Sequence, residues 1–219
     1  MGIIDLIYPK KCLECKTLGE YICSKCLKKV RKAISICLVC NRPSLNGRTH
    51  KKCKRPHSLD QLISGWKYGG VIRKALLTLK YKYATDVAEE LITKYLKELK
   101  APVPKKAIFV PIPMHPKRKK WRGFNQAEEL GKIITKKLDW DYIPDLLIRT
   151  RYTKPQTELK GEARKKNVVG VFKVNPDYRN YSNIILFDDV TTTGSTLKEA
   201  GKILKMNGVK KVRGFTIAR

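Results

Sequence analysis

The chain has 219 residues, 42% of them apolar, and carries 48 Lys and Arg against 19 Asp and Glu, a formal net charge of +29. The apolar content is enough for a core and excludes wholesale disorder. The apolar runs are far shorter than the roughly 20 residues of a membrane-spanning helix. The positive charge points to a polyanionic partner without specifying a fold. Residues 1–11 lack the apolar stretch and cleavage site of a signal peptide, so we expect a chain that is not exported.

All seven cysteines lie in one N-terminal segment, and their odd number argues against a disulfide framework. With one histidine they form four pairs separated by two residues: Cys12 and Cys15, Cys23 and Cys26, Cys37 and Cys40, and His50 and Cys53. This spacing lets both side chains of a pair bind one tetrahedral ion. Four pairs supply eight ligands, so we predict two closed, structural zinc sites.

Two details of the zinc ligation stay open at this point. The pairs can combine in sequential order, the first two at one site and the last two at the other, or in a crossed arrangement. His57, separated from Cys53 by three residues, is the alternative to His50 as a ligand. The segment has few large apolar side chains, and bound zinc would supply the missing folding energy. We therefore expect a zinc-ribbon domain over residues 1–57 and a second domain over residues 58–219.

The first half of the second domain begins with an apolar and basic stretch, residues 58–83, in which Trp66 and Tyr68 are candidates for stacking on bases. Aromatic side chains next to apolar residues are, however, more typical of a core. An apolar repeat at helical spacing predicts a helix from residue 84 to 99. A short strand over residues 107–110 and a helix over residues 126–138, capped by Asn125, follow.

The second half alternates strands and a helix. We expect strands at residues 146–148, 168–174, 183–187 and 209–217, and a helix at residues 197–206. Such alternation predicts an α/β fold with a parallel sheet and helices on its faces. The polar, basic stretch over residues 149–167 is too long for an ordinary connection, which indicates a functional loop or a disordered segment.

The most informative stretch is residues 184–197, where an apolar strand runs into Asp188 and Asp189 and then into a hydroxyl-rich turn with Gly194. Ligands of open α/β sheets bind at the carboxyl ends of strands. The N–H groups of the turn and of the following helix favour a phosphate, and the two carboxylates can accept hydrogen bonds from a sugar diol. The pattern outlines a ribose 5-phosphate site. The alternative is a plain polar turn with Thr193 or Ser195 as the helix cap.

This stretch resembles the phosphoribosyl pyrophosphate motif of the type I phosphoribosyltransferases. The resemblance implies that Asp188 and Asp189 hold the ribose hydroxyls. It assigns the 5-phosphate to the residues that follow: Thr191, Thr192, Thr193, Gly194, Ser195 and Thr196. Further motifs resemble the ComF/GntX family, whose members join a zinc ribbon to a phosphoribosyltransferase-like domain. They are Val110–His115, Arg118, Arg122–Ala127, Thr153, Gln156, Leu159, Arg164, Asn167 and Phe172.

The family resemblance implies a bacterial cytoplasmic protein, without a membrane span, that is linked to natural competence and to the uptake of single-stranded DNA. It implies phosphoribosyl pyrophosphate and Mg²⁺ as ligands, single-stranded DNA as a partner, and a competence helicase or DNA-processing proteins as further partners. The stretch over residues 149–167 would close over the site as a flap. The candidate cations for the pyrophosphate are Arg122, Arg149, Arg151, Lys154, Lys160 and Arg164.

Two features of the sequence leave the reaction open. Purine-salvage members of the superfamily carry an acid at the position of Thr192, so the resemblance leaves orotate-like, amine or unknown acceptors, or no turnover. Arg122 and the amides of Asn125 and Gln126 are either substrate contacts or the start of a helix. The second hypothesis is a non-catalytic competence factor that uses the same pocket to recognise a nucleotide or a phosphate. It would bind single-stranded DNA through the basic clusters at residues 117–122, 164–166 and 210–213, with Trp121 stacking on a base.

Overall fold

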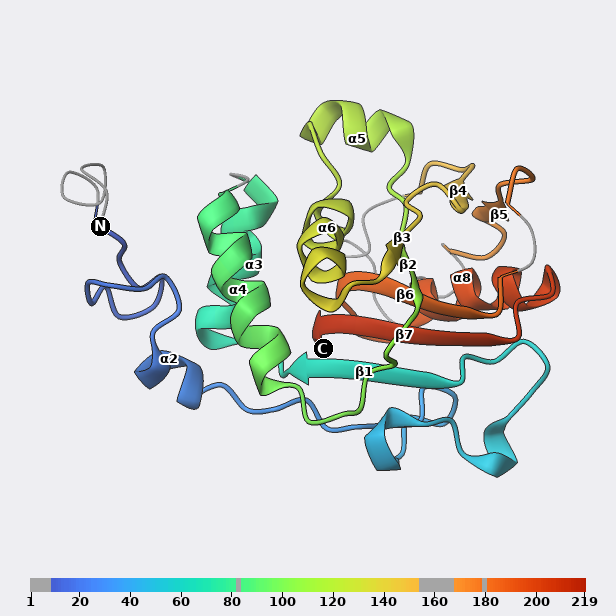
Figure 1. The fold of residues 1–219 in the computed structure, drawn as a ribbon, viewed down its shortest axis with the longest axis horizontal. Helices are drawn as coiled ribbons and strands as arrows, with labels where there is room; N and C mark the ends of the chain where they lie inside the picture. The colour runs from blue at the N-terminus through green and yellow to red at the C-terminus, as the bar shows by residue number, and fades with distance from the viewer. Residues whose placement is uncertain (1–8, 82–83, 154–167, 179–180) are drawn as a thin grey trace.

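The computed structural model describes residues 9–81, 84–153, 168–178 and 181–219, and a parallel five-stranded sheet lies at its centre (Figure 1). The strand order is β1-β7-β6-β2-β3, and every neighbouring pair is parallel. These strands are β1 (Gln61–Trp66), β2 (Ile108–Pro111), β3 (Asp141–Tyr142), β6 (Asn183–Val190) and β7 (Lys211–Ala218). A separate antiparallel pair consists of β4 (Leu147–Arg149) and β5 (Phe172–Val174). The predicted α/β class with a parallel sheet is confirmed.

Helices cover both faces of the sheet because the strands are apolar on both sides. In β6, Ile185 and Phe187 belong to one core, whereas Ile184 and Leu186 belong to the other. The first core is completed by α3 (Gly70–Tyr81), α4 (Thr85–Glu98) and α6 (Gln126–Leu138), and the second by α8 (Ser195–Met206). The other helices among the described residues are short: α2 (Ser24–Lys28), η1 (Leu45–Gly47), η2 (Lys51–Cys53) and α5 (Pro116–Arg122).

Most of the predicted elements are present, and several regions differ. α5 and β3 were not predicted, and the strands predicted over residues 146–148 and 168–174 pair with each other outside the parallel sheet. Residues 58–83, for which no bounded element was predicted, contain β1 and α3. Trp66 is 1% exposed, so the core interpretation of this aromatic residue is confirmed. The strand predicted over residues 168–174 is shorter, because the chain turns at Gly170 with a φ of +66°. The Gly170 N–H donates to Oε1 of Glu199 on α8 (2.8 Å) rather than to a neighbouring strand.

The N-terminal segment covers the outer edge of β1, beneath which the chain passes in Figure 1. The Ala33 N–H donates to the Gly65 carbonyl (3.0 Å), and the Lys67 N–H donates to the Arg31 carbonyl (2.8 Å). The segment thus pairs with the sheet through backbone hydrogen bonds, as an additional strand would.

The same segment contributes side chains to both cores of the sheet. Cys12, Ile22 and Cys26 are buried in the core that contains α3 and α4. Leu38 is buried in the core that contains α8. Residues 9–57 and the sheet domain therefore share their hydrophobic cores, although the sequence divides them at residue 57.

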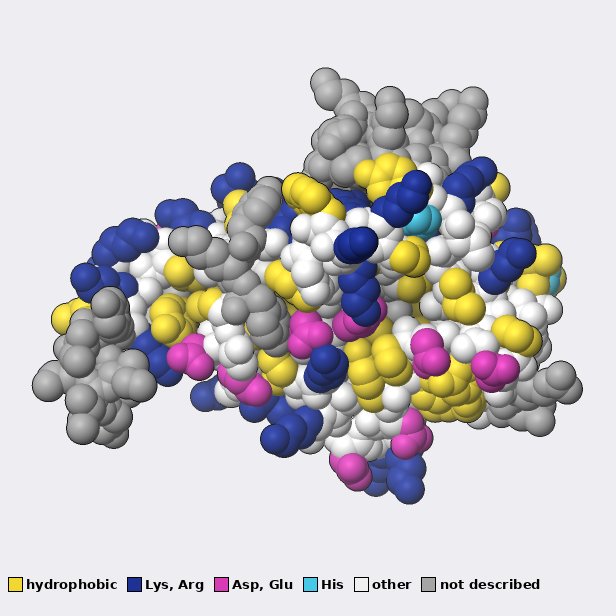
Figure 2. Space-filling model, turned by 90° about the horizontal axis from the view of Figure 1, so that it is seen from above, with side chains coloured by type: hydrophobic (Ala, Val, Ile, Leu, Met, Phe, Trp, Pro, Cys, Tyr) yellow, Lys and Arg dark blue, Asp and Glu magenta, His cyan; other side chains and the backbone are white. Residues whose placement is uncertain are grey.

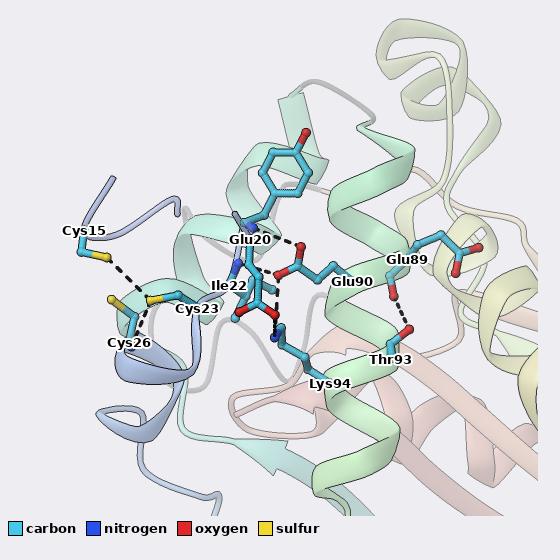
Figure 3. Close-up of polar contacts among 10 residues, drawn as sticks. Cys15, Glu20, Ile22, Cys23, Cys26, Glu89, Glu90, Thr93 and Lys94 are labelled. Atoms are coloured by element: carbon cyan, nitrogen blue, oxygen red, sulfur yellow. Dashed lines mark hydrogen bonds and ion pairs between the residues drawn. The ribbon is translucent and has the colours of Figure 1, made fainter. Parts of the chain in front are cut away.

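A carboxylate of α4 fastens the N-terminal segment to the helical face (Figure 3). Glu90 accepts the Tyr21 N–H at Oε2 (3.0 Å) and the Ile22 N–H at Oε1 (2.7 Å). Hydrogen bonds to a charged acceptor are among the stronger ones in proteins. This contact fixes the chain between Cys15 and Cys23 against α4.

Candidate functional site

Cysteine and histidine side chains meet in two clusters, each with its four ligand atoms within 4.8 Å of one another. One cluster contains Cys12, Cys15, Cys23 and Cys26, and the other contains Cys37, Cys40, His50 and Cys53. The ligands thus combine in the sequential order, and His50 rather than the exposed His57 completes the second cluster. Four sulfur atoms, or three with one imidazole nitrogen, are the donor sets of structural zinc sites.

Neighbouring backbone groups orient the ligands of both clusters. Nδ1 of His50 lies 3.4 Å from the Cys40 sulfur, while Nε2 lies 3.0 Å from the Pro43 carbonyl. A proton on Nε2 donated to this carbonyl leaves Nδ1 as the ligand atom, which is the usual arrangement around zinc. In the other cluster the Cys23 sulfur accepts the Cys26 N–H (3.4 Å; Figure 3). Both clusters fit zinc, as the sequence predicts.

The two aspartates stand at the carboxyl end of β6, and the chain turns directly after them. Oδ1 of Asp188 accepts the Asp189 N–H (3.1 Å), and Oδ1 of Asp189 accepts the Val190 N–H (2.9 Å). The Thr191 N–H donates to the carbonyl of Ala218 at the end of β7 (3.0 Å), which holds the start of the turn to the sheet. The two carboxylates are therefore placed by backbone contacts at the sheet edge where open α/β folds bind ligands.

The turn over residues 191–194 leads into α8 through Gly194, whose φ is +70°. This left-handed conformation favours glycine strongly. Gly194 occupies the cap position, and no side chain caps the helix. The hydroxyl of Thr193 instead accepts the Ser195 N–H at 3.4 Å. A helix start with a glycine cap presents its N–H groups to an anion.

Arg149 of β4 lies close enough to Asp188 for their charges to interact. Its guanidinium stacks on Phe172 (5.7 Å from Cζ to the ring centre) and donates from Nη2 to the Thr153 hydroxyl (2.5 Å). Nε of Arg149 is buried and, among the described residues, is the buried side-chain polar atom that has no hydrogen-bond partner. Such an orphaned donor needs a ligand or water to offset its desolvation.

Burial and neighbouring charges shift the pKa values of this group. Burial raises the pKa of Asp188 well above its usual value, and the adjacent Asp189 carboxylate raises it further. Burial also lowers the pKa of Arg149, and the charge of Arg118 adds to this effect. The structure therefore brings Arg118, from the motif at residues 110–127, into the same group of charges. Sequence reasoning named Arg149 as a site residue but not Arg118.

The other candidates named from the sequence have different environments. Arg122 donates to the Lys80 carbonyl (3.1 Å) and to Oε1 of Gln126 (2.8 Å), which ties the start of α6 to α3. Asn125 accepts the Ala127 N–H (3.1 Å), so its role as a helix cap is confirmed.

Arg151 is exposed and donates from Nη2 to the Val169 carbonyl (2.7 Å). The flap prediction rests mainly on residues outside the described ranges, and three of its cations belong to that part of the chain: Lys154, Lys160 and Arg164.

Apart from the zinc clusters and the end of β6, the helix α5 is a candidate binding surface; it is the short basic helix near the top of Figure 1. Its Trp121 is 82% exposed, the largest exposure among the described large hydrophobic residues. Around it stand the basic residues of the helix: Lys117, Arg118, Lys119, Lys120 and Arg122. Figure 2 shows Lys and Arg side chains spread over this side of the molecule rather than gathered in one patch. An exposed aromatic ring within a basic helix is the pairing that single-stranded nucleic acids bind.

Comparison with known proteins finds relatives for the N-terminal segment and for nearly the whole chain. The double zinc ribbon domain family matches residues 3–55. A relative from Salmonella typhi, named DNA utilization protein YhgH, is 28% identical over 210 residues, which cover 90% of each chain. Competence protein ComFC of Bacillus subtilis is 28% identical over 210 residues, covering 91% of this chain and 85% of the relative.

Among solved structures, the adenine phosphoribosyltransferase of Leishmania donovani is 14% identical, with a TM-score of 0.38. The match covers 64% of this chain and 55% of the enzyme. In the described residues, no helix is long and apolar enough to cross a membrane.

Proposed function

We propose that this chain, which belongs to the ComF family, binds phosphoribosyl pyrophosphate at the β6–α8 connection and acts as a phosphoribosyltransferase in the handling of DNA. One observation carries the proposal. The paired carboxylates of Asp188 and Asp189, the glycine-capped start of α8 and the orphaned Nε of Arg149 belong to one end of the sheet. The names of the relatives, which refer to competence and DNA utilization, support the connection with DNA.

Each part of this site matches one part of the ligand. Asp188 and Asp189 accept hydrogen bonds from the 2- and 3-hydroxyls of the ribose, and the turn into α8, residues 192–196, holds the 5-phosphate. Arg149 and Arg118 supply positive charge for the pyrophosphate, which Mg²⁺ accompanies because hard phosphate oxygens suit this ion. Transfer breaks the bond between the anomeric carbon and pyrophosphate and joins that carbon to a nucleophilic acceptor. Thr192 cannot take a proton from this acceptor as a carboxylate would.

Calorimetry with phosphoribosyl pyrophosphate and Mg²⁺ tests the site. We expect the double variant Asp188→Asn/Asp189→Asn to lose binding, because the amides weaken the charge-assisted hydrogen bonds to the ribose. The matched control is Asp139→Asn/Asp141→Asn, which removes the same charge from two exposed residues next to the amino end of β3. Unchanged affinity in Asp188→Asn/Asp189→Asn would contradict the assignment of the ribose site to these two aspartates. Release of pyrophosphate with one member of a panel of bases, amines and DNA ends would establish turnover.

A second function, binding of single-stranded DNA, is favoured by the exposed Trp121 on α5. Stacking of one base on an aromatic side chain contributes about 1–3 kcal/mol, so we expect Trp121→Ala to weaken binding of an oligothymidine about 5-fold or more. Trp121→Phe keeps an aromatic ring and is expected to retain most of the affinity. Fluorescence anisotropy at several salt concentrations measures both effects, because phosphate contacts make the affinity fall steeply with salt. Wild-type affinity in the Trp121→Ala variant would remove Trp121 from the interface.

A further inference from the structure

Leu38, which lies between two ligands of the second zinc cluster, packs against the turn over residues 191–194, called here the phosphate-binding turn. Leu38 follows the ligand Cys37, and its side chain is 2% exposed. It lies against Gly194 so closely that a Cβ on this glycine would be 2.4 Å from Cδ1 of Leu38. Gly194 is therefore needed for two reasons: its left-handed φ and the space that the leucine fills.

The position of Leu38 depends on the ligands beside it. The Asn41 N–H donates to the Cys37 carbonyl (2.8 Å), and the Cys37 N–H donates to the Arg42 carbonyl (2.9 Å), so the chain forms a tight turn around the metal ligands. Leu38 sits within this turn, between Cys37 and Cys40. A filled metal site cross-links the turn and fixes the direction of the leucine side chain.

The turn that carries Gly194 is held from two sides. β7 holds its start through the Thr191 N–H, and Leu38 packs against its end, where the Gly194 carbonyl accepts the Lys198 N–H (2.8 Å) and begins α8. Leu38 and Ser195 also line a cavity of about 460 Å³. Shortening Leu38 would join this open space to the contact and give the turn room to move.

We infer that Leu38 is a positioning residue for the phosphate-binding turn, and that the second zinc site, but not the first, is coupled to binding of the ligand's 5-phosphate. The inference rests on the proposed function for the identity of the ligand. The first cluster joins the opposite core of the sheet, with α3 and α4, and so lacks this route to the turn. A backbone turn that binds a phosphate in one geometry needs side chains packed against it, as Leu38 is here, to hold its conformation.

Leu13 provides a matched control, because it follows Cys12 in the first cluster as Leu38 follows Cys37 in the second, and packs partly buried against the other core. Hydrogen exchange is measured on zinc-loaded, ligand-free protein, with zinc content checked in each variant. We expect Leu38→Ala to speed exchange over residues 191–198 on the order of 10-fold, with Leu13→Ala leaving this stretch unchanged. Leu38→Val removes less of the side chain, so we expect a smaller increase in exchange over residues 191–198. This variant replaces Leu38→Ala in the test if the Ala variant does not fold.

Binding of phosphoribosyl pyrophosphate provides the second measurement. We expect Leu38→Ala to weaken it on the order of 10-fold or more, and Leu13→Ala to leave it unchanged. A double-mutant cycle adds a direct test: the loss caused by Gly194→Ala should be smaller in the Leu38→Ala background, since the clash is relieved. Unchanged exchange in Leu38→Ala and Leu38→Val would overturn the inference. If the wild type fails to bind the ligand while the exchange effect is present, the proposed function fails and the support of the turn by Leu38 stands.

Discussion

Removal of zinc with a strong chelator is expected to unfold the whole chain, not only its N-terminal quarter. Cys12 and Cys26 are buried in one core of the sheet, and the second cluster places Leu38 in the other. Structural zinc contributes about 10 kcal/mol or more per site to folding in small zinc domains. This contribution is comparable to the whole net free energy of unfolding of a typical domain, about 5–15 kcal/mol. Calorimetry of the loaded protein should show one unfolding transition, and the chelated protein should lack it.

Elemental analysis completes this prediction. The loaded chain should hold two zinc ions, and His50→Ala should hold close to one, because His50 is a ligand of the second cluster. His57→Ala is the matched control and should keep both, since the exposed His57 is outside the clusters. A chelated protein that keeps an unchanged transition for the sheet domain would show that the zinc segment is an independent module.

Asp188→Asn is expected to stabilise the free protein while it weakens ligand binding. Burial and the charge of Asp189 raise the pKa of Asp188 in the folded chain. Folding then takes up a proton at any pH between the unfolded value, about 4, and the raised value. Stability therefore falls as the pH rises through this window, and the asparagine variant lacks that loss. We expect its free energy of unfolding to be higher at pH 8 by about 1 kcal/mol or more.

The same variant loses a charge-assisted hydrogen bond to the ribose, so its affinity for phosphoribosyl pyrophosphate should fall about 10- to 150-fold. Urea unfolding at pH 5 and pH 8 measures the first effect, and the stability gain should shrink toward the lower pH. Asp141→Asn, at an exposed residue, should change neither property. A lower free energy of unfolding in Asp188→Asn at pH 8 would mean that this carboxylate serves the fold rather than a ligand.

Sequence patterns predicted the elements whose conformation is set by neighbouring residues in the chain. The helix over residues 126–138 has the predicted bounds, because its apolar repeat and its Asn125 cap are both local signals. β1 could not be predicted in the same way. Ser64 and Gly65 interrupt its apolar run, and its extended form depends on pairing with β7 and with residues 31–33. Such long-range pairing is absent from any local pattern.

In the candidate site, too, residues close together in the sequence could be predicted, whereas contacts between distant residues could not. Asp188, Asp189 and Gly194 are adjacent in the sequence, and their order alone predicted a ligand site at the end of a strand. The zinc ligands could also be predicted, because the two-residue spacing within each pair is a local property of the sequence. The approach of Arg149 to Asp188, and of Leu38 to Gly194, joins residues far apart in the chain. Only the fold brings these pairs together.

The backbone pairing of residues 31–33 with β1 also protects the sheet from association with other chains. An open parallel sheet ends in two strands whose unpaired N–H and carbonyl groups can recruit a strand from another molecule. At one end the sheet stops with the two-residue β3, which begins at the exposed, charged Asp141 and is too short to serve as a template. At the other end the longer β1 is covered by the zinc segment. Residues 31–33 lie between the last ligand of the first cluster, Cys26, and the first ligand of the second, Cys37, so we expect removal of zinc to free this edge of the sheet as well.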